Sequence, residues 1–123
     1  MVINVLAQRY AVCMLEKATL PEGEFVSLSI SAAEISLVCE EARMPKRCVR
    51  AEKGWRALRV KGPLDFTLTG ILAELSAILA NAGVSIFAVS TYETDYILVK
   101  DECIKAAKDA LVAQGHSVLE NKS

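Results

Sequence analysis

Two stretches of the chain share one pattern of hydrophobic and polar positions. Residues 25–41 (FVSLSISAAEISLVCEE) and 85–102 (SIFAVSTYETDYILVKDE) each contain two apolar, β-branched runs joined by a short polar turn. Alternation of this kind is typical of half-buried strands, and two such runs around a turn predict a β-hairpin. A serine ends the first run in both copies, at Ser31 and Ser90. A repeated hairpin indicates two copies of one supersecondary unit.

The second half of the chain contains the clearer series of elements. Residues 55–61 predict a strand, because Leu58 and Val60 alternate with Arg59 and Lys61. Residues 71–82 carry apolar side chains at helical spacing, and Gly83 is typical of a helix C-terminus. A second helix is predicted over residues 103–113 and a last strand over residues 116–119. With the hairpin between the helices, the order is β-α-β-β-α-β, which predicts an α+β fold with both helices on one face of an antiparallel sheet.

The first half has the strands of such a unit but not its helices. Residues 5–15 predict a long strand, and residues 18–24 form a loop too short for a crossover helix. Residues 42–53 contain Pro45 and five basic side chains, and we interpret them as one helical turn followed by a solvent-exposed connector. The sequence therefore predicts two domains: residues 1–54, a degenerate copy made mostly of strands, and residues 55–123, a complete βαββαβ domain.

Composition and charge exclude several classes of function. The chain has 123 residues, of which 53% are hydrophobic, and a net charge of −1 with acids and bases interspersed. No basic stripe is available to neutralise phosphates, so a nucleic-acid partner is not expected. No apolar stretch approaches the roughly 20 residues that span a bilayer, so no membrane partner is expected either. Without a recognisable secretion signal, we expect a cytoplasmic protein.

The residues that most often carry chemistry do not form a catalytic pattern. No two of the four cysteines, Cys13, Cys39, Cys48 and Cys103, lie within three residues of each other, so no metal-ligand pair is present in the sequence. We interpret them as reduced, mostly buried thiols. The single histidine, His116, is interpreted as a solvated loop residue. The sequence thus predicts no cofactor, no metal and no enzymatic activity.

Apolar residues occur on both faces of the strand predicted at residues 85–91. Phe87 and Val89 lie on one face, and Ile86 and Ala88 lie on the other. A sheet with helices on one side only would leave one of these faces in water. Either the other half of the chain or a second chain must cover it, and we expect a homodimer.

Residues 62–100, GPLDFTLTGILAELSAILANAGVSIFAVSTYETDYILVK, resemble the ACT domain, a regulatory module that binds small molecules. The segment is similar to the tandem ACT pairs of stand-alone bacterial proteins and of eukaryotic arginine sensors, and residues 85–99 are similar to the regulatory region of aspartate kinases. The resemblance implies a ferredoxin-like βαββαβ fold, a tandem arrangement with a degenerate first copy, and side-by-side pairing of sheets. It also implies an amino acid as ligand in the groove between paired domains.

The resemblance also indicates where such a ligand would bind. In this family the site uses the loop between the first strand and the first helix, together with the start of the second strand. Carried onto this chain, the site residues are Asp65, Phe66, Thr67, Leu68, Thr69, Gly70 and Ile71, with Val84, Ser85 and Ile86 opposite. The start of the helix would bind the ligand's carboxylate through backbone N–H groups, and Asp65 would face its ammonium group.

Several of these residues also have a purely structural interpretation. Asp65 could cap its own loop, Phe66 could fill the core, Thr69 could cap the helix and Gly70 could allow close helix–sheet packing. The favoured hypothesis is a sensor that passes its signal to a protein partner. The alternatives are a dimerisation or interaction module with no ligand, and, with least support, an enzyme.

Overall fold

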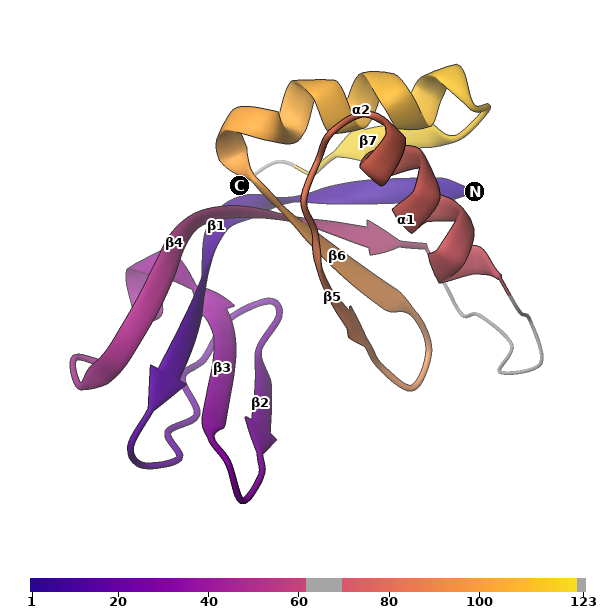
Figure 1. Cartoon of the computed structure of the whole chain (residues 1–123). Helices are drawn as coiled ribbons and strands as arrows, with labels where there is room; N and C mark the ends of the chain where they lie inside the picture. Colours follow the sequence, from indigo (N-terminus) through magenta and orange to yellow (C-terminus); the bar gives the residue numbers. More distant parts are fainter. Residues whose placement is uncertain (62–69, 122–123) are drawn as a thin grey trace. The chain divides into compact units, whose positions relative to one another are not determined.

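The computed structural model describes residues 1–61 and 70–121 of the chain, which contain strands, two α-helices and two short 3-10 turns (Figure 1). In chain order the elements are β1 (Val2–Leu15), β2 (Ser27–Ile30), β3 (Ile35–Glu40), η1 (Glu41–Arg43), β4 (Cys48–Val60), α1 (Ile71–Asn81), β5 (Phe87–Ser90), β6 (Asp95–Lys100), η2 (Asp101–Cys103), α2 (Ile104–Ala113) and β7 (Ser117–Glu120). They divide into two compact units. Unit 1 comprises Met1–Ala7 and Arg56–Ser123, and unit 2 comprises Gln8–Trp55, so β1 and β4 each contribute to both.

Unit 1 contains the predicted order of elements, from β4 through α1, β5, β6 and α2 to β7. Its strands lie in the order β5-β6-β4-β1, with β7 beside β1, and both helices lie on one side of these strands (Figure 1). The helices bury one face each: Leu75 and Leu79 of α1 and Leu111 of α2 are at most 1% exposed. These leucines pack in one core with Ile97 and Val99 of β6. Burying a leucine side chain contributes about 1.5–3 kcal/mol, so this core holds the helices on the sheet.

The first residues of the chain form a strand of unit 1 that the sequence analysis did not place there. The strand begins at Val2 rather than at residue 5, and its residues 2–5 pair in parallel with β7, Val2 opposite Ser117. On its other side, the Lys61 N–H donates to the Val2 carbonyl at 2.8 Å. β1 therefore lies between β4 and β7. The division into domain copies at residues 54 and 55 stays a prediction, whereas the compact units place Met1–Ala7 with Arg56–Ser123.

Unit 2 is built from strands in the order β2-β3-β1-β4. All its residues are described, and its longest helical element is the three-residue turn η1. Its core consists of Ala11, Cys13, Leu15, Leu37 and Cys39, with partly buried Val26, Leu28, Ile35, Met44 and Cys48 around them. Of the interpretation of residues 42–53, the helical turn is found as η1, but the connector after it was wrong, because β4 begins at Cys48. Residues 49–53 are exposed, so no apolar alternation marks this part of the strand.

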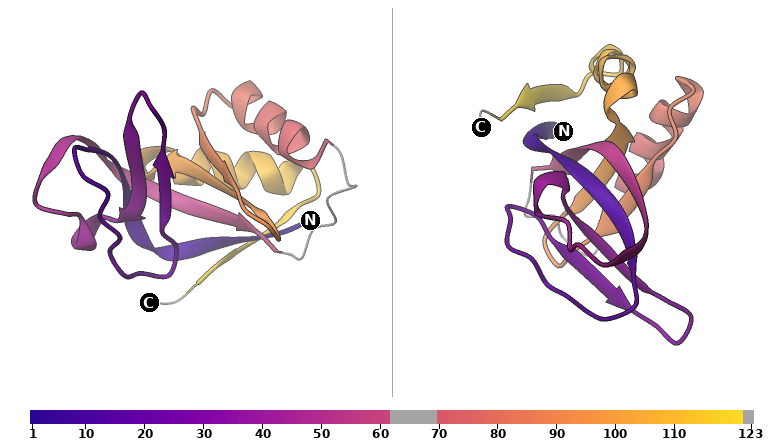
Figure 2. Two further views of the ribbon diagram at one scale, coloured as in Figure 1. Left: turned by 90° about the horizontal axis from the view of Figure 1, so that it is seen from below. Right: turned by 90° about the vertical axis from the view of Figure 1, so that its left-hand side faces the viewer.

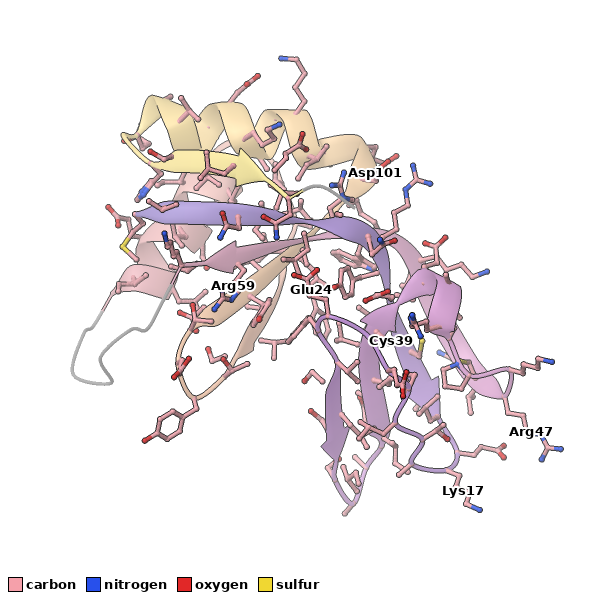
Figure 3. The ribbon with its side chains drawn as sticks, turned by 180° about the vertical axis from the view of Figure 1, so that it is seen from behind. Lys17, Glu24, Cys39, Arg47, Arg59 and Asp101 are labelled. Atoms are coloured by element: carbon pink, nitrogen blue, oxygen red, sulfur yellow. The ribbon has the colours of Figure 1, made fainter. Side chains whose placement is uncertain are left out.

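A loop between β1 and β2 occupies the chain position that a first helix would have in unit 2. Glu40, which is only 9% exposed, holds this loop by accepting the Glu24 N–H at 2.7 Å (Glu24 is labelled in Figure 3). Gly23 allows the close approach, since a Cβ there would lie 2.8 Å from the Glu40 carboxylate oxygen. The loop is thus fixed by a carboxylate rather than by apolar packing of a helix.

The repeated hairpin is confirmed, and its two copies have the same register. Ser27 pairs with Val38 in β2–β3, and Phe87 pairs with Leu98 in β5–β6, so both partners move by 60 positions. The narrow β2–β3 copy is seen from two sides in Figure 2. The turns match as well: Ser31 N–H donates to the Glu34 carbonyl at 3.0 Å, and Thr91 N–H to the Thr94 carbonyl at 2.8 Å. By this register Ser31 corresponds to Thr91, and Ser90 corresponds to Ile30.

Candidate functional site

The start of helix α1 is the centre of the candidate site. Gly70 occupies the N-cap position with a φ of +82°, a left-handed conformation that glycine adopts far more readily than other residues. Its carbonyl accepts the Glu74 N–H at 2.8 Å, which closes the first turn. Gly70 is exposed, and glycine has no side chain that could cap the helix. Backbone N–H groups at a helix start lack intrahelical partners and lie at the positive end of the helix dipole, so they favour an anionic group such as a carboxylate.

The predicted residues on the opposite side have different environments. Val84 is 5% exposed and its N–H donates to the Leu79 carbonyl at 2.9 Å, so it belongs to the core and closes the end of α1. Ile71 and Ile86 are partly buried and pack against the same core. Ser85 between them in sequence is exposed. The structure therefore brings Ile71, Val84 and Ile86 together as packing residues, and leaves Gly70 and Ser85 accessible to a ligand.

The other five predicted site residues, Asp65, Phe66, Thr67, Leu68 and Thr69, lie outside the described residues. Their assignment as ligand-binding residues stays a prediction.

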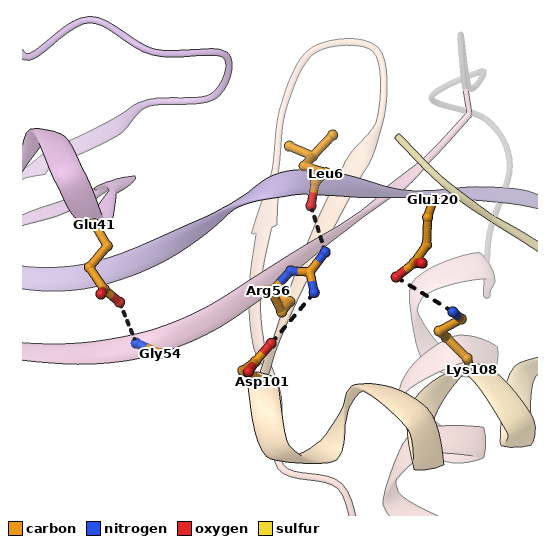
Figure 4. A network of polar contacts seen from close by, with 7 residues as sticks. All are labelled: Leu6, Glu41, Gly54, Arg56, Asp101, Lys108 and Glu120. Atoms are coloured by element: carbon orange, nitrogen blue, oxygen red, sulfur yellow. Dashed lines mark hydrogen bonds and ion pairs between the residues drawn. The ribbon is translucent and has the colours of Figure 1, made fainter. Parts of the chain in front are cut away.

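One acidic residue attaches each 3-10 turn to β4 (Figure 4). In unit 2, Glu41 accepts the Gly54 N–H at 2.9 Å. In unit 1, Asp101 lies 3.5 Å from the Arg56 guanidinium, which also donates to the Leu6 carbonyl at 3.2 Å. Glu41 and Asp101 are the first residues of η1 and η2. The equivalent position after each hairpin therefore contacts β4 through a carboxylate.

His116 is buried, and its interpretation as a solvated loop residue was wrong. It is 8% exposed, and its N–H donates to the Leu111 carbonyl at 3.1 Å. Its Nε2 lies 4.0 Å from a Glu74 carboxylate oxygen of α1, beyond hydrogen-bonding distance. His116 immediately precedes β7, which pairs with β1, so its surroundings depend on how the chain returns from α2. Neither ring nitrogen has a hydrogen-bond partner among the described residues.

Three cysteines that are far apart in sequence meet in unit 2. Cys13 and Cys39 are buried, Cys48 is partly buried, and all three belong to one apolar cluster. Burial, together with the neighbouring Cys39 and Cys48, raises the pKa of the Cys13 thiol to about 12. Burial also raises the pKa of Cys39. Among the described residues, no group of three or more His, Cys, Asp or Glu side chains is arranged to hold a metal ion.

Comparison with known proteins assigns the class of protein. A family model described as the ACT domain matches residues 50–113, a segment that runs from β4 to the end of α2 and includes the helix start at Gly70. A protein from Agrobacterium tumefaciens of known crystal structure is 31% identical, with 99% of this chain and 94% of that chain covered and a TM-score of 0.89. The chain belongs to the ACT domain family.

Two structures of aspartate kinases are also similar. The enzyme from Synechocystis matches with a TM-score of 0.69 and 16% identity, over 98% of this chain and 28% of that one. The regulatory subunit of the Thermus thermophilus enzyme matches with a TM-score of 0.64 and 7% identity, over 90% and 95%. At these identities the similarity concerns the fold, and it agrees with the resemblance noted from the sequence. No helix within the described residues is long and apolar enough to cross a membrane.

Proposed function

We propose that this protein is a regulatory protein that binds an amino acid at the start of α1, carries out no catalysis itself, and acts through a protein partner. The observation that carries the proposal is the exposed, left-handed Gly70 at the N-cap of α1, inside the segment that matches the ACT domain. Regulatory subunits of this fold, such as that of the Thermus thermophilus aspartate kinase, support the regulatory part.

The proposed binding mode uses backbone groups more than side chains. The ligand's carboxylate accepts N–H groups at the start of α1, its ammonium group faces Asp65, and backbone groups of Ser85 and Ile86 complete the contacts. One anion contact at a helix end contributes about 0.3–1 kcal/mol. Micromolar affinity corresponds to about 8 kcal/mol, so several contacts must act together.

The proposal includes a tandem arrangement in which residues 1–54 are a degenerate ACT copy. The equal registers of the two hairpins support duplication. The first copy has a loop where the second has α1, so it offers no helix start, and we infer one competent site per chain. We further propose that the protein is a cytoplasmic homodimer. The ligand would favour one mutual orientation of the paired domains, because it binds that orientation more tightly than the other.

Calorimetry and thermal denaturation with each of the twenty amino acids test this function. At a ligand concentration of 100 times Kd, binding should stabilise the folded protein by about 2.7 kcal/mol and raise its melting temperature. Gly70→Ala should remove the response, because a Cβ is strained at a φ of +82° and the helix start must shift.

Gly83→Ala is the matched control, because Gly83 follows the same helix with a φ of +75° and a Cβ there meets nothing within 4 Å among the described residues. It should cost similar stability, about 1 kcal/mol, and retain binding. If none of the twenty amino acids gives a binding heat or a shift in the melting temperature of the wild-type protein, the alternative, an interaction module without a ligand, would be favoured. Sedimentation as a monomer at micromolar concentration would contradict the homodimer.

A further inference from the structure

Three neighbouring strands of unit 2 each contribute one thiol to a single cluster. β3, β1 and β4 lie side by side and carry Cys39, Cys13 and Cys48. Cys13 and Cys39 belong to the buried apolar cluster of unit 2, and Cys48 packs against that cluster. Cys39, labelled in Figure 3, is fully buried, Cys13 is 2% exposed, and Cys48 is only partly buried. The fourth cysteine, Cys103, packs against the core of unit 1.

The register between β1 and β3 disfavours a bond between Cys13 and Cys39. Cys13 lies opposite Leu37, and Cys39 lies opposite Ala11, so Cys13 and Cys39 are diagonal neighbours. Diagonal neighbours are about 7–8 Å apart, whereas a disulfide needs Cα atoms about 4.4–6.8 Å apart. Joining Cys13 to Cys39 would therefore distort the ladder between two buried strands.

Cys48 can move toward Cys13 with less disruption of the sheet than Cys39 can. It is the first residue of β4 and follows the short segment after η1 that contains Pro45. Its Sγ donates to the Pro45 carbonyl at 3.1 Å, a contact within its own turn that can be given up without breaking a strand ladder. Its partial exposure also makes it the member of the cluster that a dissolved oxidant can reach.

We infer that Cys13 and Cys48 are a redox pair, which a hydroperoxide converts to an intramolecular disulfide while Cys39 remains a thiol. In the first step the Cys48 sulfur attacks the peroxide O–O bond, giving a sulfenic acid at Cys48 and releasing an alcohol, or water from hydrogen peroxide. In the second step the Cys13 sulfur attacks the Cys48 sulfur, the S–O bond breaks, and the Cys13 proton leaves with the hydroxyl group as water. One peroxide is reduced by two electrons and two thiols are oxidised to one disulfide.

The buried partner makes the second step slow and dependent on pH. The thiolate is the nucleophile, and the raised pKa of Cys13, about 12, leaves little thiolate at neutral pH. Burial keeps the pKa of Cys13 above that of an exposed thiol, so disulfide closure under excess peroxide should be slow at pH 7 and should still be accelerating at pH 9. An ordinary exposed thiol with a pKa near 8.5 would level off across the same range.

Oxidation would have a structural consequence for unit 2. A bond from Cys13 to Cys48 closes a loop that contains the entire β2–β3 hairpin. Restricting a loop of that size in the unfolded chain should raise the melting temperature by about 10 °C. Reduction with dithiothreitol should reverse the shift.

Intact-mass and peptide-mass analysis of the full chain after hydrogen peroxide treatment tests the inference. We expect the loss of two hydrogen atoms and a cross-linked peptide pair containing Cys13 and Cys48. Cys39→Ala and Cys103→Ala should still form this bond, and Cys48→Ala should not. Cys13→Ala should instead accumulate a sulfenic acid at Cys48 that dimedone traps.

The wild-type peptide map decides the assignment even if a variant fails to fold. A bond that includes Cys39 or Cys103, a bond only between two chains, or oxidation of Cys48 to sulfinic acid without closure would each overturn the inference. A rate of closure that levels off near pH 8.5 would contradict the role of Cys13 as the buried nucleophile. None of these outcomes depends on whether the protein binds an amino acid.

Discussion

The two hairpins of this chain have the same register and the same turn hydrogen bonds, yet the chain leaves them differently. After β5–β6, the turn η2 leads directly into the ten-residue helix α2. After β2–β3, the equivalent turn η1 stops and the chain enters β4. The residues that follow the turns account for the difference. Ile104 is helical (φ −60°, ψ −39°), whereas Met44 is extended (φ −58°, ψ 137°) and precedes Pro45.

Proline disfavours the helical conformation in the residue before it, so η1 cannot propagate through Met44. The comparison teaches that the hairpin is specified locally, by alternation and by its turn, while the helix after it depends on one or two residues. Three sets of substitutions test this contrast.

The largest effect is expected in the helical core that only unit 1 possesses. Leu79→Ala removes a side chain of α1 that is fully buried, and the cavity should reduce the free energy of unfolding by about 3 kcal/mol. Val112→Ala is the control, since Val112 on α2 is 56% exposed and should change stability by less than about 0.5 kcal/mol. Chemical denaturation measures both, and equal effects would mean that α1 does not depend on this core.

A smaller effect should follow from giving the second hairpin the proline of the first. Lys105→Pro places proline after Ile104, whose helical conformation it disfavours, and should cost about 2 kcal/mol and shorten α2. Circular dichroism would report the lost helix signal. Lys105→Ala removes only an exposed pair with Asp109 and should cost less than about 0.5 kcal/mol. If the proline variant keeps the full helix signal, Pro45 is not the reason that η1 stops.

The smallest effect is expected for the acidic contact to β4 that occurs once after each hairpin. Glu41→Ala removes the acceptor of the Gly54 N–H, and Asp101→Ala removes a partner of Arg56. Each should cost about 1 kcal/mol in urea denaturation. Glu41→Gln, which keeps an acceptor oxygen, should recover most of the loss. A large difference between the two alanine variants would show that the equivalent positions have different roles.

Much of unit 1 could be predicted from local patterns. The helices follow from apolar spacing, the end of α1 from Gly83, and the hairpins from alternation. The position of β1 could not be predicted, because pairing between residues 2 and 117 is a tertiary choice that no local pattern records. The first part of β4 was missed because its residues are exposed and do not alternate. The burial of His116 was missed because it depends on tertiary contacts rather than on a local pattern.

The candidate site was predicted less completely than the fold. Gly70 and Ser85 are exposed, as a ligand site requires. Val84, which was carried over from the family site, is instead buried in the core. The thiol cluster carried no sequence signal, because Cys13, Cys39 and Cys48 belong to three strands and only pairing brings them together.

The parallel pairing of β1 with β7 also orders events during synthesis. Every pair of unit 2 is available once residue 55 has been made, because Gln8–Trp55 is one continuous stretch. The partner of Val2 is Ser117, so the opening strand of unit 1 has to wait until almost the whole described chain has been translated. A nascent chain that has emerged only as far as residue 55 can therefore form the pairs of unit 2, whereas the pairing of β1 with β7 in unit 1 requires residues 117–120 as well.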